Sequence, residues 1–177
     1  LKIFLENVNI HKLDGDIDYR TRNIIKFDEH DSNKIISDVE IFNFIIDNFG
    51  LDQQKSDQIS INDRKFNCKL VSNNILWIEF NDFFREATGS KDYIYISNKF
   101  DWVFISNFKK NNDDTIDIIR RFISFIDITY TNRTKIKFFF NDIDIETIYT
   151  GSKIENLWVR CKSRLSEMRT QEYLTNN

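Results

Sequence analysis

The chain has 177 residues, of which 41% are hydrophobic and 30% are charged, a balance typical of a folded soluble domain rather than a disordered segment. Its net charge of −3 gives no overall positive field, so a nucleic-acid binder is the least favoured class. No apolar run approaches the roughly 20 residues that a transmembrane helix requires.

The amino-terminal part of the sequence predicts one strand and one helix. Residues 7–13 mix β-branched and polar positions as a strand does, and the turn D-G-D follows them. A helix is expected over residues 34–50, with Gly50 as its stop. The apolar positions that recur at helical spacing are Ile35, Val39, Phe42, Ile46 and Phe49.

A polar connection is expected over residues 51–58, and a hairpin after it. Two strand-like runs, 65–71 and 75–80, are separated only by S-N-N, which is typical of a hairpin turn. The next segment predicts a short helix that is capped by Asn81 and ended by Gly89.

The second half alternates helices and strands regularly. Helices are expected over 90–100, from the Asn/Asp cluster 111–114 onward, and over 155–174, with strands at 101–106 and 135–140. This order and spacing predict an α/β layer with parallel strands. The stripe expected to face the core on the middle helix consists of Ile116, Ile119, Ile123, Ile126 and Tyr130.

The sequence offers little for metal binding or nucleophilic catalysis. Cys68 and Cys161 are far apart, as are His11 and His30, so we interpret the cysteines as incidental thiols and expect no metal site. The four glycines are too scattered to build a G-x-x-x-x-G-K-[ST] phosphate loop. Because the sequence begins at Leu1 rather than Met, we expect it to be a piece of a longer chain.

The last helix carries the most informative polar pattern. Its apolar stripe is formed by Trp158, Cys161, Leu165 and Met168, and a separate polar stripe by Arg160, Arg164, Glu167 and Gln171. One reading is a solvated face on which Arg164 pairs with Glu167. The other is a phosphate-facing arginine pair, because a guanidinium binds phosphate oxygens bidentately and keeps its charge. The pattern alone leaves both open.

The segment 160–174, R-C-K-S-R-L-S-E-M-R-T-Q-E-Y-L, resembles the C-terminal signature R-T-x-S-R-L-x-E-M-x-S-x-x-Y-L of the ZapE-type cell-division ATPases and their mitochondrial relatives. Four further stretches, at 13–22, 77–108, 117–130 and 145–151, resemble other motifs of this family in the same order. The chain departs from the family at Lys109, Phe140, Asn141 and Cys161.

The resemblance implies the C-terminal half of an AAA+-type ATPase with an α/β fold. Residues 1–22 are expected to end the P-loop ATPase core with its last strand. Residues 23–177 are expected to form an α/β extension with a hairpin and a C-terminal helix. The P-loop and the magnesium-binding acids are expected upstream, so this segment is expected to hold no catalytic residue and to be inactive alone.

The resemblance also implies what the intact protein does. It is expected to bind ATP and Mg²⁺ and to couple ATP hydrolysis to work on protein partners such as the bacterial division ring. It is expected to form homo-oligomers and to lie in the bacterial cytoplasm, with at most peripheral contact at the inner face of the membrane. The alternative is a non-enzymatic protein-interaction domain, a diverged remnant of that family.

Within this chain the resemblance assigns nucleotide binding to four arginines. Arg164 is expected to face the nucleotide phosphates or the site of an adjoining subunit, with Glu167 orienting it. For Arg20 and Arg22 the alternative is that one of them forms a local ion pair with Asp18, which fixes the loop. The four candidates are Arg20, Arg22, Arg160 and Arg164.

Overall fold

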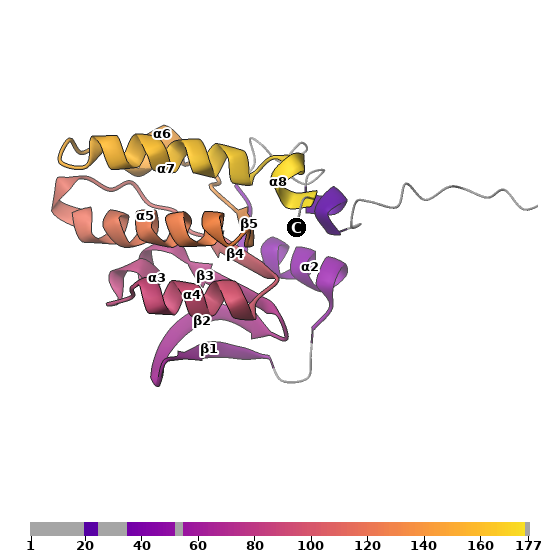
Figure 1. The fold of residues 1–177 in the computed structure, drawn as a ribbon. Helices are drawn as coiled ribbons and strands as arrows, with labels where there is room; N and C mark the ends of the chain where they lie inside the picture. Colours follow the sequence, from indigo (N-terminus) through magenta and orange to yellow (C-terminus); the bar gives the residue numbers. More distant parts are fainter. Residues whose placement is uncertain (1–19, 25–34, 52–54, 176–177) are drawn as a thin grey trace, which may run out of the picture.

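The computed structural model describes residues 20–24, 35–51 and 55–175 (Figure 1). Residues 20–24 are helical. The other elements in chain order are α2 (Asp38–Phe49), β1 (Ser56–Ile61), β2 (Arg64–Ser72), β3 (Ile75–Glu79), α3 (Phe80–Arg85), α4 (Ser90–Lys99), β4 (Trp102–Ser106), a 3₁₀ turn (Asp113–Thr115), α5 (Ile116–Thr131), β5 (Lys135–Phe138), α6 (Ile145–Ile148), α7 (Glu155–Met168) and α8 (Gln171–Thr175). The expected strand over 7–13 lies outside the described residues.

The strands form one mixed sheet in the order β1-β2-β3-β4-β5. The first three run antiparallel, which confirms the predicted hairpin, whereas β3, β4 and β5 run parallel, as the strand–helix alternation predicts. All five residues of β4 are buried, as expected of a central parallel strand covered on both faces. The mixed α/β class is therefore confirmed.

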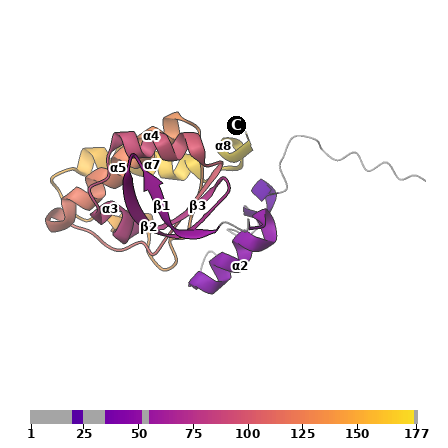
Figure 2. The same ribbon diagram turned by 90° about the horizontal axis from the view of Figure 1, so that it is seen from below.

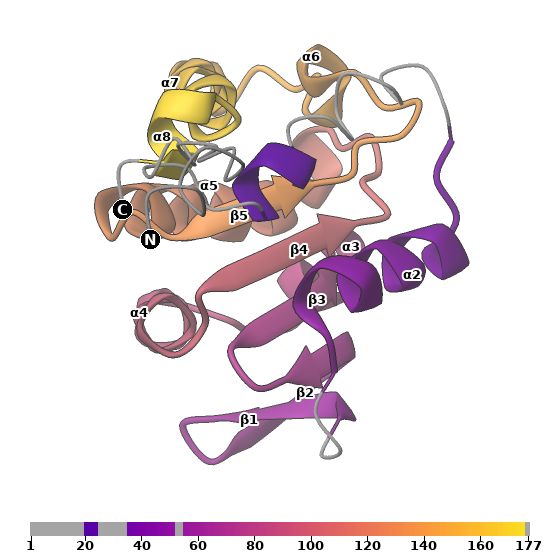
Figure 3. The same cartoon turned by 90° about the vertical axis from the view of Figure 1, so that its right-hand side faces the viewer.

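Helices cover both faces of the sheet. Figures 2 and 3 show α2 on the face away from α4, α5 and α7. On the α2 face, the ring of Phe49 lies 5.7 Å from Trp102 and 5.4 Å from Phe104, centroid to centroid. On the other face α3, α4 and α5 pack together, and α7 lies on α5 as an outer layer (Figure 1).

Helix α2 confirms the predicted helix but not the face expected to be buried. Its cap is strong, because Ser37 Oγ accepts from the Glu40 amide while the Glu40 carboxylate accepts from the Ser37 amide at 2.9 Å. Gly50 ends the helix with φ of +68°, as predicted. However, Ile35 and Val39 are 66% and 68% exposed. The buried side chains of α2 are Ile41, Phe44 and Ile45, and of the predicted stripe Phe49 does pack on the sheet.

Three boundary predictions were wrong. The expected polar connection over 51–58 overlaps β1, an edge strand whose inward residues are only Ile59 and Ile61. Helix α3 begins before Asn81, which is buried within it, and ends four residues before Gly89; Gly89 instead precedes α4. These segments are short, and their polar residues face solvent or a neighbouring element rather than marking an end.

The expected last helix over 155–174 is two helices. Helix α7 ends at Met168, and Thr170 caps the start of α8. The Thr170 hydroxyl accepts a hydrogen bond from the Tyr173 amide at 3.2 Å. The predicted apolar stripe of α7 is confirmed, since its four members are at most 3% exposed. On α5 the predicted stripe is only partly right, because this helix lies between the sheet and α7 and buries two sides. Its buried residues are Ile118, Ile119, Phe122, Ile123, Phe125, Ile126 and Thr129.

The loop that leads into α7 is closed by one carboxylate. Asp113 accepts hydrogen bonds from the Tyr149 hydroxyl and from the amides of Ser152 and Lys153, both at 3.2 Å. The Tyr149 hydrogen bond, with the two amides, holds the pKa of Asp113 below its usual value. A Cβ atom added to Gly151 would overlap both the Asp113 carboxylate and the Tyr149 ring, so only glycine fits.

We predict that Gly151→Ala destabilises the chain by about 1–3 kcal/mol, because the added methyl must displace the Tyr149–Asp113 contact. Urea unfolding of the variant measures this loss. Gly89→Ala is the matched control, because nothing lies within 4 Å of a Cβ at that position. Equal stability of the two variants would contradict the steric argument.

Asp92 joins the amino end of α4 to the β1–β2 turn. It is 2% exposed and accepts from Arg64 at 2.6 Å, from the Gly89 amide at 2.9 Å and from Asn62 at 3.1 Å. Burial acts to raise the pKa of Asp92, but these hydrogen bonds outweigh it, so the pKa lies below its usual value. The folded protein therefore binds this proton more weakly than the unfolded chain does.

We predict that Asp92→Asn costs about 2 kcal/mol of unfolding free energy at neutral pH. Because the folded-state pKa is depressed, this contribution is complete above the unfolded-state value of about 3.9 and is lost as the pH falls below it. Urea unfolding at a series of pH values should show the two proteins converging on acidification. A constant difference, or the same convergence for Asp82→Asn on the exposed side of α3, would be evidence against this linkage.

Candidate functional site

Two of the four predicted arginines meet at a single carboxylate. Arg160 Nη2 lies 2.7 Å from Asp127 Oδ2, and Arg164 Nη1 donates to Asp127 Oδ1. The two guanidinium groups come from α7, one turn apart, and the aspartate from α5, so the ion pairs join the outer helix to the inner one. The Arg164 side chain is 26% exposed and that of Arg160 is 51% exposed.

A second layer of contacts continues from this arginine pair toward α8. The Arg164 guanidinium lies over the Tyr130 ring, 5.1 Å from its centroid, and the Tyr130 hydroxyl donates to Glu167 at 2.7 Å. Glu167 therefore reaches Arg164 through Tyr130. The Tyr130 ring also stacks on Tyr173, at 5.8 Å, and the Arg133 guanidinium lies 5.3 Å from the Tyr173 ring centroid. We call Asp127, Tyr130, Arg160, Arg164, Glu167 and Tyr173 the arginine cluster.

The arginine cluster brings together two sequence motifs that are separate along the chain. Asp127 and Tyr130 belong to the motif at 117–130, and the other members to the motif at 160–174. Asp127 was not among the residues predicted from the sequence to belong to the site. The signal that could have found it is its spacing, since Asp127 and Tyr130 lie on one side of α5, three residues apart.

The other two predicted arginines are placed by different contacts. Arg20 lies 5.2 Å from the Phe49 ring centroid and lines a cavity of about 330 Å³ at the amino ends of β4 and β5. Arg22 is exposed. Asp18, the expected partner of this pair, lies outside the described residues. The structure thus does not gather the four arginines into one site, although Arg133 lines the Arg20 cavity and also contacts Tyr173.

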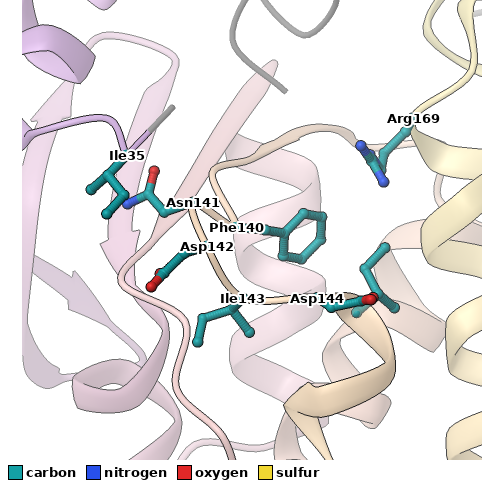
Figure 4. A pocket seen from close by; sticks show the side chains of 8 residues that line it. Ile35, Phe140, Asn141, Asp142, Ile143, Asp144 and Arg169 are labelled. Atoms are coloured by element: carbon teal, nitrogen blue, oxygen red, sulfur yellow. The ribbon is translucent and has the colours of Figure 1, made fainter. Parts of the chain in front are cut away.

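A larger cavity of about 530 Å³ lies beyond the carboxyl end of β5, a common ligand position in α/β sheets (Figure 4). The Arg169 guanidinium lies over the Phe140 ring at 5.3 Å, and Asp142 and Asp144 line the other side. Asn141 ties the wall to Ile36, accepting its amide at 2.9 Å. With one guanidinium against two carboxylates, this cavity is poorly suited to a phosphate group.

One buried cation, Lys137, was not predicted from the sequence. Lys137 on β5 is 3% exposed, and its Nζ lies 5.1 Å from the Phe139 ring centroid on the α2 face. Burial, with a smaller effect of Arg169, lowers the pKa of Lys137 to about 7. In the sequence this lysine sits in an alternating strand pattern and looks like an exposed residue.

The described residues offer no set of three metal-ligating side chains close enough to hold an ion. Cys161 is buried on the inner side of α7, and Cys68 is partly buried. Burial raises the pKa of both thiols, and that of Cys68 is raised to about 12. Neither thiol is set up as a nucleophile. In the part of the chain that the structure describes, we find no helix with the length and apolar character needed to span a membrane.

We predict that Arg164 and Asp127 couple energetically in a double-mutant cycle to alanine, by about 1 kcal/mol in urea unfolding. The reason is that this pair is only about a quarter exposed. The matched cycle of Arg160 with Asp127 should give a few tenths of a kcal/mol, because that guanidinium is half exposed. Coupling energies in the reverse order would show that the cluster is held by something other than the Arg164 ion pair.

The comparisons with known proteins agree with the motifs. The family model of AFG1-like ATPases matches residues 1–177. The cell division protein ZapE of Escherichia coli K12 is 29% identical over 122 residues, covering 69% of this chain and 32% of ZapE. An uncharacterized protein of Schizosaccharomyces pombe is 24% identical over 151 residues, covering 70% of this chain and 33% of that protein. No solved structure matches.

The chain thus spans about a third of the length of the curated relatives that it matches. The family match extends over every residue of the chain, including both motifs whose side chains meet at Asp127. This chain belongs to the AFG1-like ATPase family.

Proposed function

We propose that this chain is the C-terminal part of an AAA+-type ATPase that couples ATP hydrolysis to work on protein partners. In this proposal residues 1–22 complete the P-loop core, and residues 23–177 form its α/β extension. The family match and the similarity to a protein named for cell division support it. The partners are then those of a bacterial division ring, reached from the cytoplasm. ATP and Mg²⁺ bind to the P-loop core, and the protein works as a homo-oligomer.

The observation that carries the proposal is the arginine cluster. Arg164 is held by two contacts, the Asp127 carboxylate and the Tyr130 ring, and the Tyr130 ring is in turn held by its hydrogen bond to Glu167. A guanidinium held in this way has lost most of its side-chain freedom before any ligand arrives. Each of the two arginines gives one nitrogen to Asp127, which leaves further N–H donors of the same fork for a phosphate oxygen.

The same contacts join the proposed nucleotide site to the fold. Asp127 belongs to α5, which packs on α3 and α4, whereas Arg164 belongs to the outer helix α7. A phosphate that binds Arg164 therefore weakens the ion pair between Arg164 and Asp127, which holds α7 against α5. In our proposal this is how a change at the nucleotide reaches the surface that contacts the partner.

A non-enzymatic interaction domain is the second candidate, and one observation favours it. Helix α2 and the segment just before it expose apolar side chains: Ile35, two residues before the Ser37 cap, is 66% exposed, Val39 68% and Ile46 36%. Exposed apolar residues grouped on one element are typical of a protein-contact surface. This candidate differs from the first because it predicts no dependence of ATP turnover on the arginine cluster.

We predict that Arg164→Ala in the full-length protein lowers the rate of ATP hydrolysis by about 10³-fold or more, the loss seen when a transition-state arginine is removed. Arg164→Lys should be nearly as damaging, because an ammonium cannot replace a bidentate fork. Phosphate release measures both, alongside the melting temperature.

Asp127→Asn is the matched control. It weakens the same ion pairs but leaves both guanidinium groups in place, so it should lower stability with a much smaller loss of turnover. The chain 1–177 alone should release no phosphate above background. Wild-type turnover in Arg164→Ala, or equal losses in Arg164→Ala and Asp127→Asn, would leave the arginine with a structural role only.

A further inference from the structure

The cavity of about 530 Å³ beyond the carboxyl end of β5 contains no residue of the arginine cluster. Its volume lies within the range of about 300–1,000 Å³ that is typical of ligand pockets. Four apolar side chains line it, from the segment before α2 and from the stretch between β5 and the start of α6: Ile35, Phe140, Ile143 and Ile145. Three of them are partly buried, whereas Ile35 is 66% exposed. An apolar lining that stays open to solvent is typical of a surface that contacts another molecule.

The wall of this cavity is held in place by contacts within the chain. The Asn141 side chain accepts a hydrogen bond from the Ile36 amide at 2.9 Å and donates one to the Ile36 carbonyl at 3.3 Å. These two bonds fix the neighbouring Ile35 beside the end of β5. The Phe140 ring packs on the Phe108 ring at 4.6 Å, centroid to centroid. A ligand that binds such a wall loses little free energy to ordering the protein.

Charges of opposite sign line this cavity without pairing with each other. The Arg169 guanidinium lies over the Phe140 ring at 5.3 Å, and Figure 4 shows Asp142 and Asp144 away from it. In the part of the chain that the structure describes, none of these three charged groups forms an ion pair. Asp144 is held as the cap of α6, where it accepts the Glu146 amide at 3.0 Å. Separated charges around an apolar lining favour a ligand that carries both an acid and a base.

We propose that this cavity binds a segment of a protein partner that presents an acidic and a basic side chain on either side of an apolar one. Arg169 binds the carboxylate of the acidic side chain, and the two aspartates bind the basic side chain. The apolar side chain covers Ile35 and Phe140 and removes their surface from water.

Charge complementarity selects this occupant among possible partners. A wholly acidic segment would meet the carboxylates of Asp142 and Asp144, and a wholly basic one would meet the Arg169 guanidinium. A segment of mixed charge meets neither repulsion. This inference rests on the proposal that the protein contacts protein partners, which both candidate functions share.

The test selects random peptides displayed on phage against the chain 1–177, and the affinities of the enriched peptides are measured by fluorescence anisotropy. Enriched peptides should contain the acidic, apolar and basic residues together. Arg169→Glu should weaken their binding about tenfold or more, and replacing the acidic residue of the peptide by lysine should restore it. Ile35→Asp should weaken binding about tenfold, because it places a carboxylate against the apolar residue of the peptide.

Two matched controls lie outside the cavity. Lys110→Glu reverses an exposed charge, and Ile94→Asp alters an apolar side chain of α4 that is 46% exposed. Each should change the affinity by about twofold or less. All four positions are exposed, so the variants should keep the melting temperature of the parent chain.

The readout is peptide binding and not ATP turnover, so a negative result leaves the ATPase proposal to the Arg164 experiment. Three results would overturn the inference: no enriched peptides, binding that is insensitive to Arg169→Glu and Ile35→Asp, or no recovery of binding when the charges of Arg169 and the peptide are exchanged.

Discussion

The position of the outer helix α7 along α5 depends on the Asp127 carboxylate, which accepts hydrogen bonds from both Arg160 and Arg164. The apolar stripe beneath α7 supplies most of the free energy, but apolar contact is not directional and would tolerate a sliding helix. The two ion pairs fix the position of α7 along α5, because only one register places both guanidinium groups on the same carboxylate. The placement of α8 follows, since Tyr173 stacks on Tyr130 directly beside this contact.

Much of the fold could be predicted because its signals are local. The glycine that ends α2, the hairpin turn at S-N-N and the four-residue apolar stripe of α7 all depend on neighbours in sequence. The parallel order of β3, β4 and β5 follows from the alternation of strands with helices. The proposed boundary at residue 22 rests on family resemblance and not on these signals.

The missed features depend on partners that are distant in sequence. Edge strand β1 looks polar because only one face packs on the sheet, and α5 buries two faces because α7 covers what would otherwise be its solvent side. The same holds for the candidate site. The arginines of α7 are conspicuous in the sequence, but their partner Asp127 is 33 residues from Arg160 and 37 residues from Arg164. Arg133 and Lys135 line the same cavity as Arg20, which lies more than a hundred residues earlier in the sequence.

The asymmetry of the arginine pair bears on how Arg164 can serve both the fold and a ligand. If a phosphate draws Arg164 away from a lone aspartate, a partly buried carboxylate is left unpaired, which is costly. Here Arg160 holds the other oxygen of Asp127 at 2.7 Å, so the carboxylate keeps a cationic partner throughout. Arg160 is also the more exposed of the two and has fewer contacts to lose. The second arginine therefore lowers the free-energy cost of moving the first, which gives the pair a physical reason to occur one helical turn apart.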